Sequence, residues 1–328
     1  VRMSTGVEAV VALDTAMCAL RGGRVFCWGE NDHGQLGDGT TTDRSTPVRV
    51  EGLPTGVQSI GGGRDHACAV ADGAAYCWGR NHHGQLGDGS TATRTTAVRV
   101  SGLDSGVQRI DGGESHSCAV VDGAARCWGN GSFGRLGHGS VLPSRVPVPV
   151  SGLGSGVQDL DVGGYHSCAI VDGALECWGV GTGGALGNGD DGTRVVPVPA
   201  VGLGSGVRTV ALGYNWGCAL VHGGVRCWGE NRHGQLGDGT FDDRFEPAPV
   251  TGLESGVTHL SAGGGSACAV DDRGLRCWGL NFGAKLGNHS TDDSPLPVPT
   301  SVTRSVQRVA AGGYHSCAVV DSGAQCWG

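Results

Sequence analysis

The sequence predicts an all-β chain folded as a β-propeller, and three observations carry this prediction. A pair of cysteines recurs every 50 residues, seven times within the 328 residues, with one deletion in the last copy. Each copy contains four short extended segments separated by turn signals, which is typical of a four-stranded propeller blade. The 64 glycines and the lack of a sustained 3.6-residue periodicity argue against long helices.

The four extended segments are clearest in the third repeat. They cover residues 107–110, 116–121, 124–129 and 146–150. The last segment contains Pro147 and Pro149, which cannot donate to a central hydrogen-bond ladder, so we expect it at the outer edge of its blade. The first segment runs into Gly112 and Gly113, whose side-chain-free backbone suits the crowded axis, so we expect it innermost.

The repeats are expected to form one domain, residues 1–328. Their approximate ranges are 7–56, 57–106, 107–156, 157–206, 207–256, 257–305 and an incomplete 306–328. The last repeat reaches Gly328 before its outer segment, and residues 1–3 are too few to replace that segment. We therefore expect blade seven to lack its fourth strand, which chain upstream of Val1 or a neighbouring molecule would supply. Such an open edge would permit self-association, head to tail, into a filament.

The second and third segments of each repeat form a predicted hairpin. In the third repeat, Asp122-Gly123 is a favoured pair for a two-residue type I′ turn. Counting outward from this turn places Cys118 opposite Cys127 in a non-hydrogen-bonded pair, with Cα atoms roughly 4.5 Å apart, which a disulfide can span. Zinc is the competing interpretation, but a Cys-x8-Cys hairpin lacks the close cysteine knuckle of structural zinc sites.

All fourteen cysteines are therefore expected in disulfides within hairpins, which indicates an oxidising compartment, either extracellular or in the cell envelope. The pairs are Cys18–Cys27, Cys68–Cys77, Cys118–Cys127, Cys168–Cys177, Cys218–Cys227, Cys268–Cys277 and Cys317–Cys326. In the sixth and seventh hairpins the turn glycine is shifted by one residue, to Gly274 and Gly323. A bulged turn there would disturb the cysteine register, so these two bridges follow less directly from the pattern.

Composition and charge argue against several classes of function. The net charge of −8, with Lys285 as the single lysine, argues against nucleic acid as a partner. No run of about 18 apolar residues is present, so no membrane span is predicted. The sequence shows no nucleophile–base pair, no paired carboxylates outside the repeat and no phosphate loop. We therefore expect neither catalysis nor a cofactor.

Two patterns are compatible with metal binding but have simpler explanations. A ring of histidines could bind a metal, but three of the seven repeats lack the histidine, and a repeated strand histidine is more often a structural hydrogen-bonding group. The histidines lie two residues before a cysteine, at His66, His116, His166 and His315. Acidic connections such as residues 38–43 could bind calcium, but they lack the spacing of an EF-hand loop. We predict no metal site.

Several repeated motifs together resemble the regulator of chromosome condensation repeat family. They are Cys-Trp-Gly-x-Asn-x-x-Gly-Gln-Leu-Gly-Asp-Gly, Pro-Val-x-Val, Val-Gln-x-Ile-x-x-Gly and His-x-Cys-Ala-Val-x-Asp-Gly, and the first occurs at residues 27–39, 77–89 and 227–239. The resemblance covers essentially the whole chain and implies a seven-bladed propeller. The paired cysteines depart from the eukaryotic members and resemble secreted, bacterial relatives.

The resemblance leaves the function open, because this family includes a nucleotide exchange factor, a photoreceptor and secreted inhibitors of β-lactamases. The secreted inhibitors grip another protein with the loops between the innermost strand and the His-x-Cys strand. In this chain those loops carry tyrosine, tryptophan and arginine, which dominate binding hot spots. The candidate binding residues are Arg64, Asp65, Glu114, Tyr165, Tyr214, Asn215, Trp216 and Tyr314. We expect a secreted, non-enzymatic propeller that binds another protein; a glycan-binding propeller and a structural surface or filament subunit are the alternatives.

Overall fold

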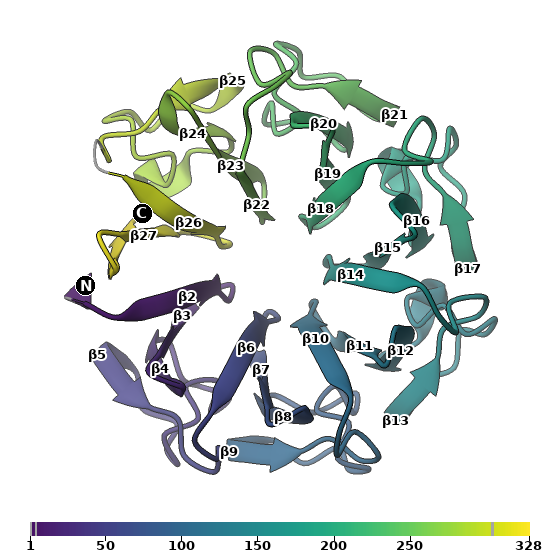
Figure 1. Cartoon of the computed structure of the whole chain (residues 1–328), viewed down its shortest axis with the longest axis vertical. Helices are drawn as coiled ribbons and strands as arrows, with labels where there is room; N and C mark the ends of the chain where they lie inside the picture. Colours follow the sequence, from purple (N-terminus) through teal and green to yellow (C-terminus); the bar gives the residue numbers. More distant parts are fainter. Residues whose placement is uncertain (1, 4, 303–304) are drawn as a thin grey trace.

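The computed structural model describes residues 2–3, 5–302 and 305–328, which form a ring of seven four-stranded antiparallel sheets around a central channel (Figure 1). The predicted seven-bladed propeller is confirmed. None of the helices in the described part of the chain is long and apolar enough to cross a membrane.

Each blade uses four strands in chain order from the axis outward, except blade seven. Blade one contains β2 (Val7–Ala12), β3 (Ala16–Arg21), β4 (Arg24–Gly29) and β5 (Arg44–Arg49). Blade two contains β6 (Val57–Gly62), β7 (His66–Ala71), β8 (Ala74–Gly79) and β9 (Arg94–Arg99). Blade three contains β10 (Val107–Gly112), β11 (His116–Val121), β12 (Ala124–Gly129) and β13 (Ser144–Pro149), and blade four contains β14 (Val157–Val162), β15 (His166–Val171), β16 (Ala174–Gly179) and β17 (Arg194–Pro199).

The remaining blades repeat this plan. Blade five contains β18 (Val207–Leu212), β19 (Trp216–Val221), β20 (Gly224–Gly229) and β21 (Arg244–Pro249), and blade six contains β22 (His259–Gly263), β23 (Ser266–Asp271), β24 (Gly274–Gly279) and β25 (Ser294–Pro299). Blade seven contains β26 (Val306–Ala311), β27 (Ser316–Val320), β28 (Gly323–Trp327) and β1 (Arg2–Met3). Three short 3₁₀ turns lie in the connections: η1 (Ser132–Gly134), η2 (Thr182–Gly184) and η3 (Phe282–Ala284). The expected order is confirmed, because Val-Gln-x-Ile strands such as β10 lie innermost and proline-bearing strands such as β13 lie outermost.

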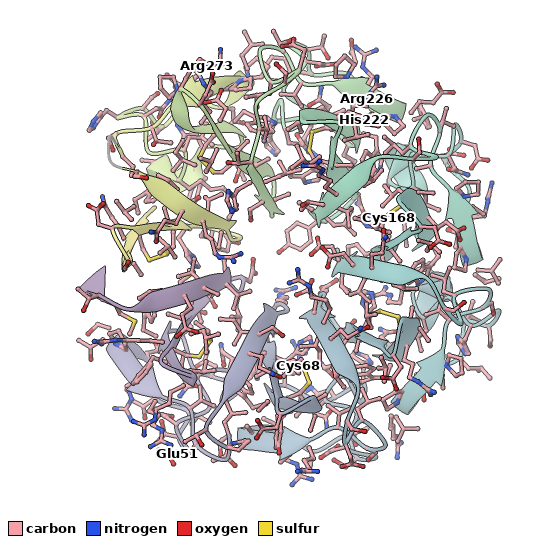
Figure 2. The ribbon with its side chains drawn as sticks, viewed as in Figure 1. Glu51, Cys68, Cys168, His222, Arg226 and Arg273 are labelled. Carbon is pink, nitrogen blue, oxygen red and sulfur yellow. A yellow bond between two sulfur atoms is a disulfide. The ribbon has the colours of Figure 1, made fainter. Side chains whose placement is uncertain are left out.

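The hairpins form as the turn residues predict. Asp122 and Gly123 have φ of +50° and +77°, as a type I′ turn requires, and Cys118 lies opposite Cys127. All seven disulfides are formed, with Cα–Cα separations of 4.0–4.1 Å, and they lie inside the blades (Figure 2).

The concern about the sixth and seventh hairpins is not supported by the structure. Asp271 pairs with Gly274 and Val320 pairs with Gly323, so each loop keeps two residues and the cysteines stay in register. Asp321 and Ser322 adopt positive φ without a glycine, and Gly274 absorbs a φ of +116° as the first residue of β24. The turn length, rather than the position of the glycine, determines the pairing.

Neighbouring blades are held together by a repeated loop. Between the third and fourth strands of blades one to six, a leucine of the loop is at most 1% exposed. The carbonyl of the residue before this leucine accepts a hydrogen bond of 2.8–3.0 Å from a tryptophan Nε1 of the next blade. In the seam between blades two and three these residues are Leu86, Gln85 and Trp128. The loop thus completes the core of the next blade.

Blade seven is closed by the start of the chain. Arg2 pairs with Gln325 and Met3 with Ala324, so β1 is the fourth strand of this sheet. The expectation that residues 1–3 cannot supply a fourth strand is therefore wrong over these two pairs, and the edge that was expected to be open is covered there. Elsewhere the fourth strand has six residues, so β1 closes less of its blade than β5 or β9 does.

Candidate functional site

The loops between the first and second strands of the blades gather around one end of the channel. Together with the loops after the third strands, they line a depression of about 380 Å³. Seven of the eight predicted residues line it, namely Arg64, Glu114, Tyr165, Tyr214, Asn215, Trp216 and Tyr314. We call this depression the bowl. The eighth, Asp65, is outside the lining set and forms an ion pair with Arg80 at 3.0 Å.

Tyr214 lies across the mouth of the channel. Its hydroxyl donates to Asp14 Oδ1 at 3.0 Å, which joins blade five to blade one. Tyr214 lines both the bowl and the channel, a cavity of about 230 Å³. Burial raises the pKa of the Asp14 carboxyl, and the hydrogen bond from Tyr214 opposes this shift. The tyrosine is still 36% exposed, so its ring remains accessible from the bowl.

An ion-pair network lies beside Tyr214. Arg64 Nη1 donates to Glu114 Oε1 at 2.9 Å, and Arg64 Nε lies 3.7 Å from Asp14 Oδ2. Tyr165 stands beyond Glu114, with the guanidinium of Arg135 at 5.1 Å from its ring centroid, a cation–π arrangement. A hydrogen bond to Glu114, together with burial, raises the pKa of the Tyr165 phenol.

The opposite wall of the bowl comes from blades five to seven. Asn215 donates to Glu230 at 3.0 Å, and Glu230 pairs with Arg232 at 2.6 Å. Tyr314 is 52% exposed, and its ring packs edge-on against Phe282 at a centroid distance of 6.1 Å.

Trp216 has a different place from the one expected. It is 1% exposed and donates through Nε1 to the carbonyl of Gly264 at 2.8 Å. It occupies the position that histidine holds in other repeats, where a larger ring fills the wall of the bowl. Trp216 therefore shapes the bowl from beneath and does not offer its ring to a partner.

Some residues of the bowl come from the loops after the third strands and were not singled out from the sequence. Glu230, Arg232, His233 and Leu280 belong to this group. Lys285 lies beneath Tyr314, where its Nζ donates to the carbonyls of Gly312 and Gly313 at 3.2 and 2.8 Å. Burial lowers the pKa of Lys285 to about 8. Its signal in the sequence was its uniqueness, because the same position holds Gln35, Gln85 and Gln235 in other repeats.

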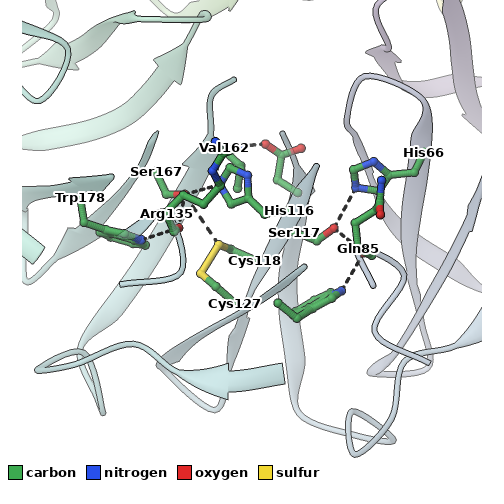
Figure 3. The surroundings of a disulfide bond; sticks show 12 residues. His66, Gln85, His116, Ser117, Cys118, Cys127, Arg135, Val162, Ser167 and Trp178 are labelled. Carbon is green, nitrogen blue, oxygen red and sulfur yellow. Dashed lines mark hydrogen bonds between the residues drawn. A yellow bond between two sulfur atoms is a disulfide. The ribbon is translucent and has the colours of Figure 1, made fainter. Parts of the chain in front are cut away.

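Two of the repeated histidines, His66 and His116, form hydrogen bonds across the seams between blades. His66 Nε2 lies 2.8 Å from Ser117 Oγ, and Ser117 donates to the Gln85 carbonyl at 2.8 Å (Figure 3). Because the serine hydroxyl donates to Gln85, its oxygen accepts a hydrogen bond from His66 Nε2–H. Burial lowers the pKa of His66 to about 4, so the imidazole is neutral. The described residues hold no group of three or more side chains suited to a metal ion.

Two carboxyls in the channel link the inner strands. Asp111 accepts from the backbone N–H groups of Gly62 and Val162, each at 3.2 Å, and so joins blade three to both neighbours. Asp161 accepts from Leu212 N at 2.6 Å. Burial raises the pKa of Asp111 to about 6, and burial together with Asp111 raises that of Asp161 well above its usual range. Burial and the neighbouring charge therefore favour the protonated form of Asp161 more than that of Asp111.

Comparison with solved structures places the fold among known propellers. The chain resembles human WBSCR16 with a TM-score of 0.87 and 23% identity, over 98% of this chain and 88% of that one. It also resembles Prp20p of Saccharomyces cerevisiae, which binds Gsp1p and histones. The TM-score is 0.83 and the identity 21%, over 97% of this chain and 82% of that one. At these identities the likeness concerns the fold.

Sequence comparison identifies the repeat itself. A stretch of 31 residues, 10% of this chain, is 58% identical to the E3 ubiquitin-protein ligase HERC2 of Homo sapiens and of Mus musculus, and covers 1% of that ligase. The regulator of chromosome condensation (RCC1) repeat matches residues 22–70, 72–120, 122–170, 222–270 and 277–319, and a second form of it matches residues 57–85. Since these segments make up well over half of the chain, the protein belongs to the regulator of chromosome condensation repeat family.

Proposed function

We propose that this propeller is a non-enzymatic protein-binding module of an oxidising compartment, extracellular or in the cell envelope, and that it binds its partner through the bowl. One observation carries the proposal: seven of the eight residues predicted from the loops line the same depression, among them Arg64 and three tyrosines. Two of them, Tyr214 and Tyr314, keep much of their ring surface exposed.

The physical chemistry of the bowl supports binding. Tyrosine offers a large contact area with few rotatable bonds, so ordering it at an interface costs little entropy. Arg64, Glu114 and Asp14 hold one another in place before a partner arrives, which lowers the entropic cost of association. The structurally similar yeast protein Prp20p binds Gsp1p and histones, and is a precedent for protein binding by such a propeller.

The test is capture of partners from the native medium or envelope on the immobilised, disulfide-intact protein, followed by mass spectrometry. We expect the Tyr214→Ala/Tyr314→Ala variant to lose the proteins that the wild type retains. Phe245→Ala is the matched control, because Phe245 is 41% exposed but lies on the outer strand β21. Equal capture by the double variant and the wild type would refute the assignment of this face.

The two alternative functions, glycan binding and a structural role, predict different experimental outcomes. Clear hits on a glycan array, with no protein retained, would favour a lectin-like function. Assembly of the purified protein into regular polymers, unaffected by either tyrosine substitution, would favour a structural role.

A further inference from the structure

Around the bowl, the arginine side chains are more exposed than the carboxylate side chains with which they pair. The side chains of Arg64 and Arg232 are 44% and 66% exposed, whereas those of Asp14, Glu114 and Glu230 are 12%, 20% and 19% exposed. The guanidiniums are therefore more accessible than the carboxylates with which they pair. An approaching partner meets the arginines first.

Both guanidiniums retain unused hydrogen-bonding capacity. Among the described residues, Arg64 has one side-chain hydrogen bond, to Glu114, and its Nε lies 3.7 and 3.9 Å from Asp14 and Asp65, while Arg232 has one, to Glu230. A guanidinium carries five N–H donors in a planar fork that matches a carboxylate. Each arginine can thus hold its own acidic neighbour and bind a second carboxylate.

Between the two arginines the bowl also holds aromatic and apolar side chains, among polar groups such as Asp14 and Asn215. The arginines come from blades two and five, which are not adjacent in the ring, and both line the bowl together with Tyr214, Leu280 and Tyr314. A concave site of about 380 Å³ fits a few side chains of a protruding segment better than a flat surface.

We propose that the bowl receives an acidic segment of the partner protein, in which carboxylates flank an apolar or aromatic side chain. This inference rests on the proposed function and names the chemistry of the partner. The carboxylates bind Arg64 and Arg232, and the apolar side chain packs against Tyr214 and Tyr314. A cationic segment is disfavoured, because the arginine side chains are more exposed than the carboxylates with which they pair.

The overall charge of the protein does not prevent this binding. The net charge of −8 is spread over a surface of 11892 Å². At physiological ionic strength the Debye length is about 8 Å, so distant charges are screened while contacts at hydrogen-bond distance are not. The local arginines therefore outweigh the global repulsion once the segment is seated.

A random peptide library displayed on phage provides the probe, because the spacing of carboxylates need not be known in advance. It is panned on the wild-type protein with the soluble Arg64→Gln/Arg232→Gln variant as competitor. We expect the selected peptides to be enriched in Asp and Glu around an aromatic residue. Synthetic copies should bind the double variant at least about tenfold more weakly than the wild type, since two charge-assisted hydrogen bonds are lost.

Arg99→Gln is the matched control. Arg99 is 58% exposed and paired with Asp104 at 2.8 Å, but it lies on the outer strand β9. Peptides with no enrichment in carboxylates, or with equal affinity for the double variant, would overturn the acidic assignment. If such peptides still lost binding to Tyr214→Ala/Tyr314→Ala, the protein-binding face itself would stand, so the two proposals fail separately.

Discussion

At the scale of single residues, the bowl depends on side chains that are far apart in the sequence. Tyr214 and Asp14 are separated by 200 residues and meet at 3.0 Å across the channel mouth. Deeper in the channel, the side-chain carboxyls of Asp111 and Asp161 accept hydrogen bonds from backbone N–H groups of the inner strands of neighbouring blades. Buried carboxyls of this kind make stability depend on pH.

The contribution of the two channel carboxyls to stability should fall as the pH rises from 5 to 8, whereas the buried histidines, whose pKa values burial lowers, contribute in the opposite direction. Burial raises the pKa of both channel carboxyls above the unfolded-state value, so the folded state binds more protons than the unfolded state. This stabilisation is complete below the unfolded-state pKa of about 4. It is lost as the pH rises through the folded-state pKa of each carboxyl, and the folded-state pKa of Asp111 is about 6.

Asp161→Asn tests this explanation, because an amide can donate to Asp111 and accept from Leu212 as the protonated acid does. We expect the melting temperature of the variant, measured by circular dichroism as its difference from the wild type at each pH, to rise between pH 5 and 8. Asp191→Asn, in an exposed connection, is the control. An unchanged pH profile in Asp161→Asn would show that the channel pair does not cause the dependence.

At the scale of elements, each blade is built from a cross-linked hairpin and a loop that completes the next blade. The hairpin is local, because its two-residue turn sets the register of β11 against β12. The loop is not local, because its leucine and carbonyl are used by the following blade. Each element thus contributes to stability in a different way.

The loop contact predicts unequal effects of one substitution at two equivalent tryptophans. Trp128→Phe removes the hydrogen bond to the Gln85 carbonyl and leaves a buried void, so we expect a loss of about 2–4 kcal/mol. For Trp28, no such carbonyl partner lies among the residues that the structure describes. Trp28→Phe should cost less in urea unfolding, and equal losses would show that the loop carbonyl contributes little.

The disulfides predict the outcome of a thiol titration. Alkylation in denaturant without reductant should label essentially none of the fourteen cysteines, and prior reduction should expose all of them, as read by intact mass. Each disulfide joins cysteines nine residues apart, for which loop-closure entropy predicts a stabilisation of at most roughly 2–3 kcal/mol. The actual stabilisation should be smaller, because the two cysteines are also close together in the unfolded chain. Several free thiols in the unreduced protein would contradict the oxidising compartment.

At the scale of the whole molecule, ring closure is concentrated in a short strand. Met3 is 8% exposed and belongs to a cluster that contains Val7 and Met17 from blade one and Val319 from blade seven. The first and last blades therefore share one core. Repeat proteins owe much of their stability to such interfaces between neighbours.

Met3→Ala should weaken the ring as a unit. We expect a loss of about 2 kcal/mol from the buried side chain. Amide hydrogen exchange by mass spectrometry should increase most in β26–β28 and β2, which contact the closing cluster. An increase spread evenly over all blades, or none, would argue against a closing role for β1.

The sequence by itself determined the repeat, the hairpins, the disulfides and the order of strands in blades one to six. These features depend on contacts a few residues apart, where turn length and the alternation of side chains leave one register. The residues at one end of the channel were also predictable as a set, because equivalent loops of a ring lie at the same end.

Only the tertiary structure decided which of those residues meet and which face outward. Trp216 is buried because the seam between blades five and six needs a large ring there, and β1 covers part of blade seven because the ring brings the two ends together. Arg232 joins Arg64 at the bowl although their loops belong to different parts of the repeat. Such pairings depend on the curvature of the closed ring, which no local segment encodes.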